Sequence, residues 1–88
     1  MFKPFGAKCI VVFEKKYLKE KGKPVLNEDG SKRYVLDQFA TVRSSNIDGI
    51  KKGDVIIPAM RGGMPIYSEE TKDKAVSIFE EDDIYGIL

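Results

Sequence analysis

The sequence contains no histidine and only one cysteine, Cys9, among its 88 residues. Without histidine, the chain lacks the commonest general base, the Ser-His-Asp and Cys-His arrangements of hydrolases, and the usual nitrogen ligand of zinc sites. A single thiol can form no disulfide within the chain, and it is typical of a reducing compartment. We therefore expect a cytoplasmic protein that is not an enzyme, with no catalytic residue, no metal site and no cofactor.

Long hydrophobic runs and a strong net charge are also missing. No apolar run approaches the ~18 residues that cross a membrane, and residues 1–8 lack the form of a signal peptide. The net charge of +1 gives no overall attraction to nucleic acid. Residues 1–33 nevertheless hold nine Lys or Arg and four Asp or Glu, whereas residues 67–88 hold two and seven. Such oppositely charged segments favour contact within one chain or between neighbouring chains.

Short runs of β-branched and aromatic residues predict an all-β domain that spans residues 1–88. Glycine-rich turns between the runs are typical of a small barrel, and Pro58 requires an edge position or a bulge. Cys9 lies in the most apolar run, so we expect it in the core. A domain this small, without disulfides, gains stability from assembly with copies of itself. The predicted strands are residues 8–14, 34–42, 54–60, 64–67, 75–79 and 84–88.

Residues 15–33 do not fit a compact barrel, because this stretch is rich in Lys, Gly, Asn and Asp and can bury little apolar surface. A loop of this length in a small domain is usually functional or disordered. Pro24, Val25 and Leu26 form an apolar triplet at its middle. The pattern alone favours an ordinary hairpin, with its turn at residues 27–30 and Val25 packed inward.

Four segments resemble the GroES family of co-chaperonins in order and spacing. Residues 50–57 (IKKGDVII) resemble its Val-Gly-Asp-(Ile/Val)-Val segment, and residues 75–88 (AVSIFEEDDIYGIL) resemble its closing strand, acidic turn and last strand. Residues 22–26 (GKPVL) fall where the mobile loop of the family carries Gly-Gly-Ile-Val-Leu. Pro4 and residues 8–12 take the place of its Pro-Leu-x-Asp-Arg-Val-(Ile/Leu)-Val motif, with Ala7-Lys8 instead of Asp-Arg.

The resemblance implies a GroES-like β-barrel with a mobile loop at residues 15–33. It also implies a function as a ring-shaped lid on an ATP-driven, GroEL-like chaperonin that helps to enclose folding substrate, with no nucleic-acid or membrane partner. The implied ring is a homoheptamer in which the N-terminal strand of each subunit pairs with the C-terminal strand of its neighbour. The implied chaperonin-binding residues are Pro24, Val25 and Leu26. The implied subunit interface consists of Lys3, Pro4, Phe5, Lys8, Ile84, Tyr85, Ile87 and Leu88.

The chain departs from the family between its second and third predicted strands. Residues 43–49 are too few for the hairpin that roofs the dome of a typical member. Some virus-encoded relatives resemble this chain in lacking that hairpin, and a viral chain would act in the host cytoplasm. We therefore predict a simple turn or short loop at this position.

Two other functions fit the sequence. The first is a small nucleic-acid-binding β-barrel, in which bases would stack on Phe13, Tyr17, Tyr34 and Phe39 beside the basic residues that precede position 34. The second is a purely structural oligomer, such as a viral decoration protein.

Overall fold

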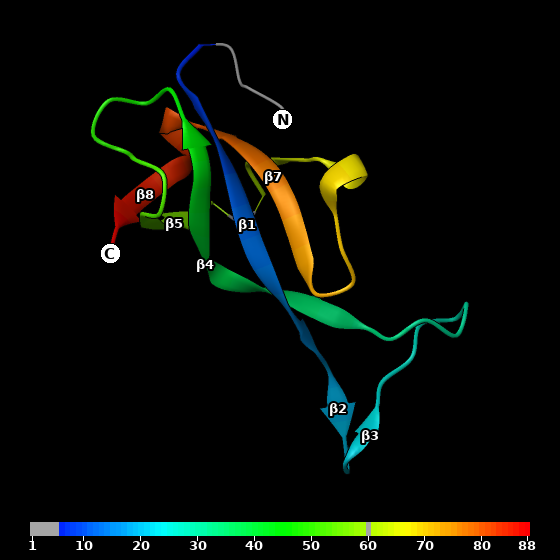
Figure 1. The fold of residues 1–88 in the computed structure, drawn as a ribbon. Coiled ribbons are helices and arrows are strands. Elements are labelled where there is room, and N and C mark those ends of the chain that lie inside the picture. The colour runs from blue at the N-terminus through cyan, green and yellow to red at the C-terminus, as the bar shows by residue number, and fades with distance from the viewer. Residues whose placement is uncertain (1–5, 60) are drawn as a thin grey trace.

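The computed structural model describes residues 6–59 and 61–88, and their architecture is all-β (Figure 1). Each of the six predicted strands is present, so the all-β prediction is confirmed. The strands are β1 (Lys8–Tyr17), β2 (Lys19–Glu20), β3 (Lys23–Pro24), β4 (Tyr34–Ser45), β5 (Val55–Pro58), β6 (Met64–Pro65), β7 (Lys74–Glu80) and β8 (Ile84–Ile87). Two short 3₁₀ turns accompany them, η1 (Tyr67–Glu69) and η2 (Glu81–Asp83).

The main sheet has the strand order β6-β7-β1-β4-β5-β8, with every pairing antiparallel. β1 occupies an interior position, in agreement with a run that is apolar on both faces. The predicted burial of Cys9 is confirmed, and a register shift at Pro58 supplies the predicted bulge. The buried core consists of Cys9, Val11, Phe13, Ala40, Val42, Ile47, Ile56, Ala75 and Phe79.

The connection from β5 to β6 shows that the sheet curls. Three strands lie between β5 and β6 in the sheet order, so in a flat sheet these two strands would be ~19 Å apart. Six residue steps lead from Pro58 to Met64, and they reach ~20 Å only when fully extended. They are not extended, because the Gly62 amide donates to the Ala59 carbonyl at 3.0 Å in a turn. The sheet is therefore curved and barrel-like.

Residues 46–54, which join β4 to β5, form two consecutive turns rather than a hairpin. The Ile50 amide donates to the Ile47 carbonyl at 3.2 Å, and the Asp54 amide donates to the Lys51 carbonyl at 3.0 Å. Ile47 is buried in the core, which fixes the link to the sheet. The prediction of a short loop in place of a roof hairpin is confirmed.

Strands β1 and β4 continue beyond the sheet and carry a projection, coloured cyan in Figure 1. The Cα radius of gyration is 14.2 Å, compared with about 12 Å for a compact chain of this length. The molecule measures 44 × 26 × 20 Å along its principal axes. We call residues 18–33 the arm, and the paired residues 15–17 and 34–36 the stem.

Candidate functional site

The arm consists of two short hairpins rather than one irregular loop. Strands β2 and β3 form the first, and Lys21 and Gly22 between them have φ values of 51° and 79°. A two-residue connection with both φ values positive is typical of the tight turns that join paired strands. The expected loop also begins later than position 15, because Lys15 to Tyr17 belong to β1.

The second hairpin has its turn at residues 27–30, the position given by the hairpin interpretation of the sequence. The Gly30 amide donates to the Asn27 carbonyl at 3.0 Å, and Leu26 is bridged to Lys32. Asp29 accepts hydrogen bonds from the Ser31 hydroxyl at 2.6 Å and the Ser31 amide at 2.9 Å. These bonds lower the pKa of Asp29 below its ordinary value, the hydroxyl contributing most.

The two hairpins and the stem meet at a cyclic junction of three backbone hydrogen bonds. The Leu18 amide donates to the Arg33 carbonyl at 2.9 Å, and the Arg33 amide donates to the Val25 carbonyl at 2.8 Å. The Val25 amide closes the cycle by donating to the Leu18 carbonyl at 3.1 Å. Each segment therefore satisfies the polar groups of the next, and this gives local structure to a stretch with little apolar surface.

The apolar triplet lies where the two hairpins join. Pro24 is exposed at the end of β3, Val25 is half-buried at the junction, and Leu26 is 52% exposed at the start of the second hairpin. The three residues line one shallow groove of about 450 Å³ together with Glu20, Lys21 and Lys23. The structure thus brings the three predicted binding residues together, and Leu26 presents the most accessible apolar side chain among them.

The predicted subunit-interface residues fall into three groups. Lys3, Pro4 and Phe5 lie outside the described residues. Lys8 begins β1 and lies opposite Glu80 of β7 in the strand register of the same chain.

In the third group, Ile84, Tyr85 and Ile87 lie on β8, the last strand in the sheet order of the described residues, and Leu88 directly follows it. Ile84 packs against the core, whereas Tyr85 and Leu88 are 77% and 68% exposed. Ile87 is also exposed. Apolar side chains along a sheet edge are unusual on a monomer, because such an edge readily pairs with another chain.

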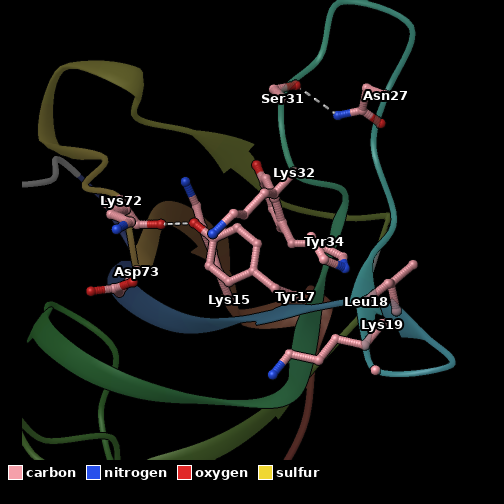
Figure 2. Close-up of a pocket in the computed structure, with 12 residues that line it drawn as sticks. Lys15, Tyr17, Leu18, Lys19, Asn27, Ser31, Lys32, Tyr34, Lys72 and Asp73 are labelled. Carbon is pink, nitrogen blue, oxygen red and sulfur yellow. Dashed lines mark hydrogen bonds between the residues drawn. The ribbon is translucent and has the colours of Figure 1, made fainter.

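A larger groove, of about 870 Å³, lies at the base of the arm (Figure 2). Its lysines come from the stem, the arm and the turn before β7. The groove is lined by Lys15, Tyr17, Leu18, Lys19, Gly22, Pro24, Asn27, Ser31, Lys32, Tyr34, Lys72 and Asp73.

Few of the aromatic rings that were considered for base stacking are free to stack. Phe13 is buried in the core, and Phe39 is half-buried. Tyr17 and Tyr34 pack edge to face with their ring centroids 5.8 Å apart, and the ammonium of Lys15 lies 4.7 Å from the centroid of the Tyr34 ring. Of the four rings considered, only that of Tyr34 is exposed, at 37%.

Chemically reactive groups are scarce in the part of the chain that the structure covers. Burial raises the pKa of the Cys9 thiol to about 11, so at neutral pH it is protonated and a poor nucleophile. Residues 6–59 and 61–88 hold no group of three His, Cys, Asp or Glu side chains placed to bind a metal ion. Over the same ranges, no helix has the length and apolar character to cross a bilayer.

The chain matches no model of a known protein family and no curated protein sequence.

Proposed function

We propose that this protein is a co-chaperonin of the GroES type, which forms a ring-shaped lid on an ATP-driven chaperonin and helps to enclose folding substrate. The observation that carries the proposal is the arm, which projects from a curled sheet and presents an exposed apolar residue, Leu26, beside Pro24 and Val25. A lid needs no catalytic group or cofactor, in agreement with a chain that lacks histidine. The order of the GroES-like segments along the sequence supports the same function.

In this proposal, each arm contacts an apolar groove of a GroEL-like ring through Leu26 and its neighbours. Complete burial of a leucine side chain is worth ~1.5–3 kcal/mol. Since Leu26 is 52% exposed in the free arm, burying the remainder contributes roughly 0.8–1.6 kcal/mol per arm. One arm alone therefore binds weakly, and useful affinity arises when several arms engage one ring together. Weak single contacts also permit rapid release, which a cycling lid requires.

The ring itself is proposed to assemble through the edge of β8, as a homoheptamer in a cytoplasmic setting. Pairing this edge with the neighbouring subunit would cover Tyr85, Ile87 and Leu88. We also propose that the curled sheet closes into a complete barrel and that the arm is mobile in the free ring. The short link at residues 46–54 would leave the top of the dome without a hairpin roof.

The test is the substitution Leu26→Asp, followed by native mass spectrometry and ATP-dependent co-elution with a GroEL-like chaperonin. We expect an unchanged oligomer that no longer co-elutes, because an aspartate in the apolar contact adds a desolvation penalty to the lost burial. The matched control is Val35→Asp, since Val35 is 49% exposed but lies on the stem. If Leu26→Asp co-elutes as well as the parent protein, the arm is not the chaperonin contact.

A gel-shift titration with single-stranded nucleic acid at several salt concentrations addresses the main alternative. Under the co-chaperonin proposal we expect no salt-dependent complex, because the net charge is +1 and the rings at the basic groove pack on each other. A tight complex that weakens steeply with salt would replace the co-chaperonin proposal by nucleic-acid binding.

A further inference from the structure

Lys15, on the stem, is buried against the turn that precedes β7. Its side chain is 7% exposed, and its ammonium forms an ion pair with the Glu70 carboxylate. The same ammonium donates to the Thr71 carbonyl at 2.9 Å and lies over the Tyr34 ring. A lysine held this way differs from the other lysines of the groove, Lys19, Lys32 and Lys72, which are exposed.

Two tyrosines of the stem complete the contact with this turn. The Tyr17 hydroxyl donates to the Lys72 carbonyl, a bond drawn in Figure 2. The Tyr34 hydroxyl donates to Glu70 at 3.4 Å, and the two rings pack edge to face. We call Lys15, Tyr17, Tyr34 and Glu70 the latch.

The turn that receives the latch is itself fixed to the sheet. Arg43 of β4 donates to the Glu69 carboxylate at 2.8 Å, and the Lys15 amide donates to the Asp73 carbonyl at 2.9 Å. Residues 67–73 therefore connect the body of the sheet, through Arg43, to the stem, through the latch.

The stem needs this support because its strand pairing is interrupted where it leaves the sheet. In the β1–β4 ladder, Phe13 pairs with Ala40 and the next pair is Lys15 with Leu36. One residue of β1 thus faces three residues of β4, a bulge at which an antiparallel pair bends readily. Beyond the bulge, the ladder holds the stem through three residue pairs only, from Lys15–Leu36 to Tyr17–Tyr34.

We propose that the latch fixes the direction in which the arm leaves the sheet, with the bulge of β4 as the pivot that the latch restrains. The four latch side chains are positioning residues, because they join the stem to the turn and lie outside the apolar triplet that contains Leu26. The significance of this direction for chaperonin binding rests on the proposed function, whereas the mechanical role of the latch does not.

The latch stays charged at physiological pH. Burial alone would lower the pKa of Lys15, but the Glu70 carboxylate and the hydroxyl groups of Tyr34 and Tyr17 together raise the pKa above 10.5. Lys15 therefore stays protonated through the neutral range.

The experiment measures the distance between the arm and the sheet by pulsed electron spin resonance. Spin labels are attached at Lys23→Cys on β3 and Asp48→Cys on the link between β4 and β5, both exposed positions. Buried Cys9 stays unlabelled, and dilution with unlabelled chain keeps the measured pairs within one subunit. The latch variants are Lys15→Met and Glu70→Gln, and the matched control is Glu14→Gln, which alters the exposed ion pair to Lys74 outside the latch.

We expect the same distance distribution in the parent protein and in Glu14→Gln, and a broader or shifted distribution in both latch variants. Exchange of the Lys15 amide should also become faster in Glu70→Gln, whereas the unfolding midpoint of the sheet should change little. An unchanged distribution in a folded latch variant would overturn the proposal, and Glu70→Gln provides this result if Lys15→Met does not fold. Undiminished co-elution of Leu26→Asp would refute the proposed function and leave the distance result untouched, so the two failures are distinguishable.

Discussion

The proposed interface can be tested by placing charge on the edge of β8. Tyr85, on the edge strand β8, is 77% exposed, and Leu88, which directly follows β8, is 68% exposed. The change is Tyr85→Lys combined with Leu88→Lys. It leaves in place Ile84, the residue of β8 that packs against the core, so the subunit should still fold. Deletion of residues 84–88 would remove Ile84 as well and would confuse loss of assembly with loss of fold.

The size of the effect follows from the exposed area of one tyrosine. A tyrosine buries ~150–250 Å², so the 77% of Tyr85 that is exposed leaves roughly 115–190 Å² for a neighbour to cover. At ~25 cal/mol per Å², this area is worth at most about 3–5 kcal/mol per interface. Loss of Tyr85 burial alone should thus raise the dissociation constant of one interface by at most roughly 10²- to 4 × 10³-fold. Two lysines along the edge add charge repulsion to that loss.

Native mass spectrometry over a range of protein concentrations measures the result, and far-ultraviolet circular dichroism with a thermal melt reports whether the monomer is folded. We expect a folded monomer at concentrations at which the parent protein is a ring. The matched control is Tyr67→Lys, because Tyr67 is 76% exposed but lies on η1. An oligomer of unchanged mass in the double variant, at every concentration, would show that the edge of β8 is not the interface.

The remaining predictions concern the connection into β6 and the second hairpin of the arm. A Cβ atom at position 63 would lie 2.5 Å from the Phe79 ring. Gly63→Ala should therefore lower the free energy of unfolding by ~1–3 kcal/mol. An unchanged denaturation midpoint would contradict the close packing of this link on the core. The hydrogen bonds from Ser31 lower the pKa of Asp29 below 3.8, so the stabilisation that they provide is present above that pH and is lost as the pH falls through the lowered pKa. Nuclear magnetic resonance shifts of the Ser31 amide should therefore change only below about pH 4, and a transition near neutral pH would refute the assignment.

The sheet could be predicted from the sequence because its strands are encoded locally. Runs such as residues 8–13 combine β-branched and aromatic side chains, and a run that is apolar on both faces must lie inside a sheet. The bulge at Pro58 could also be predicted locally, because proline has no backbone N–H to donate to a neighbouring strand. The absence of a roof hairpin followed from chain length alone.

The arm could not be predicted in the same way, because its structure comes from backbone groups rather than from a pattern of side chains. Leu18, Val25 and Arg33 satisfy one another's amides and carbonyls at the junction, and no hydrophobic periodicity signals such an arrangement. The first turn also carries a weak signal, since Lys21-Gly22 lacks the Asn or Asp that usually precedes glycine in turns with positive φ. The second turn, with Asn27 and Gly30, was recognisable.

The latch escaped prediction for a different reason. Lys15 and Glu70 lie far apart in the sequence, and each resembles an ordinary solvated charge when read alone. They meet because β7 pairs with β1 and returns the turn before it to the base of the arm. The opposite charge imbalances of residues 1–33 and 67–88 favoured contact between these segments, but only the strand order identifies the partners.

Because the arm and β8 lie apart, substitutions on them should affect ring assembly and chaperonin binding differently. Figure 1 shows the hairpin of β2 and β3 and the strand β8 on opposite sides of the molecule, so a substitution on one need not disturb the other. Leu26→Asp should abolish chaperonin binding while the ring persists, because the arm contributes nothing to the edge of β8. The double lysine variant of β8 should abolish both, because a monomer presents one weak arm and loses the multivalent gain. Binding of a folded monomer to the chaperonin at parental affinity would contradict this reasoning, since it would require one arm to supply the whole binding energy.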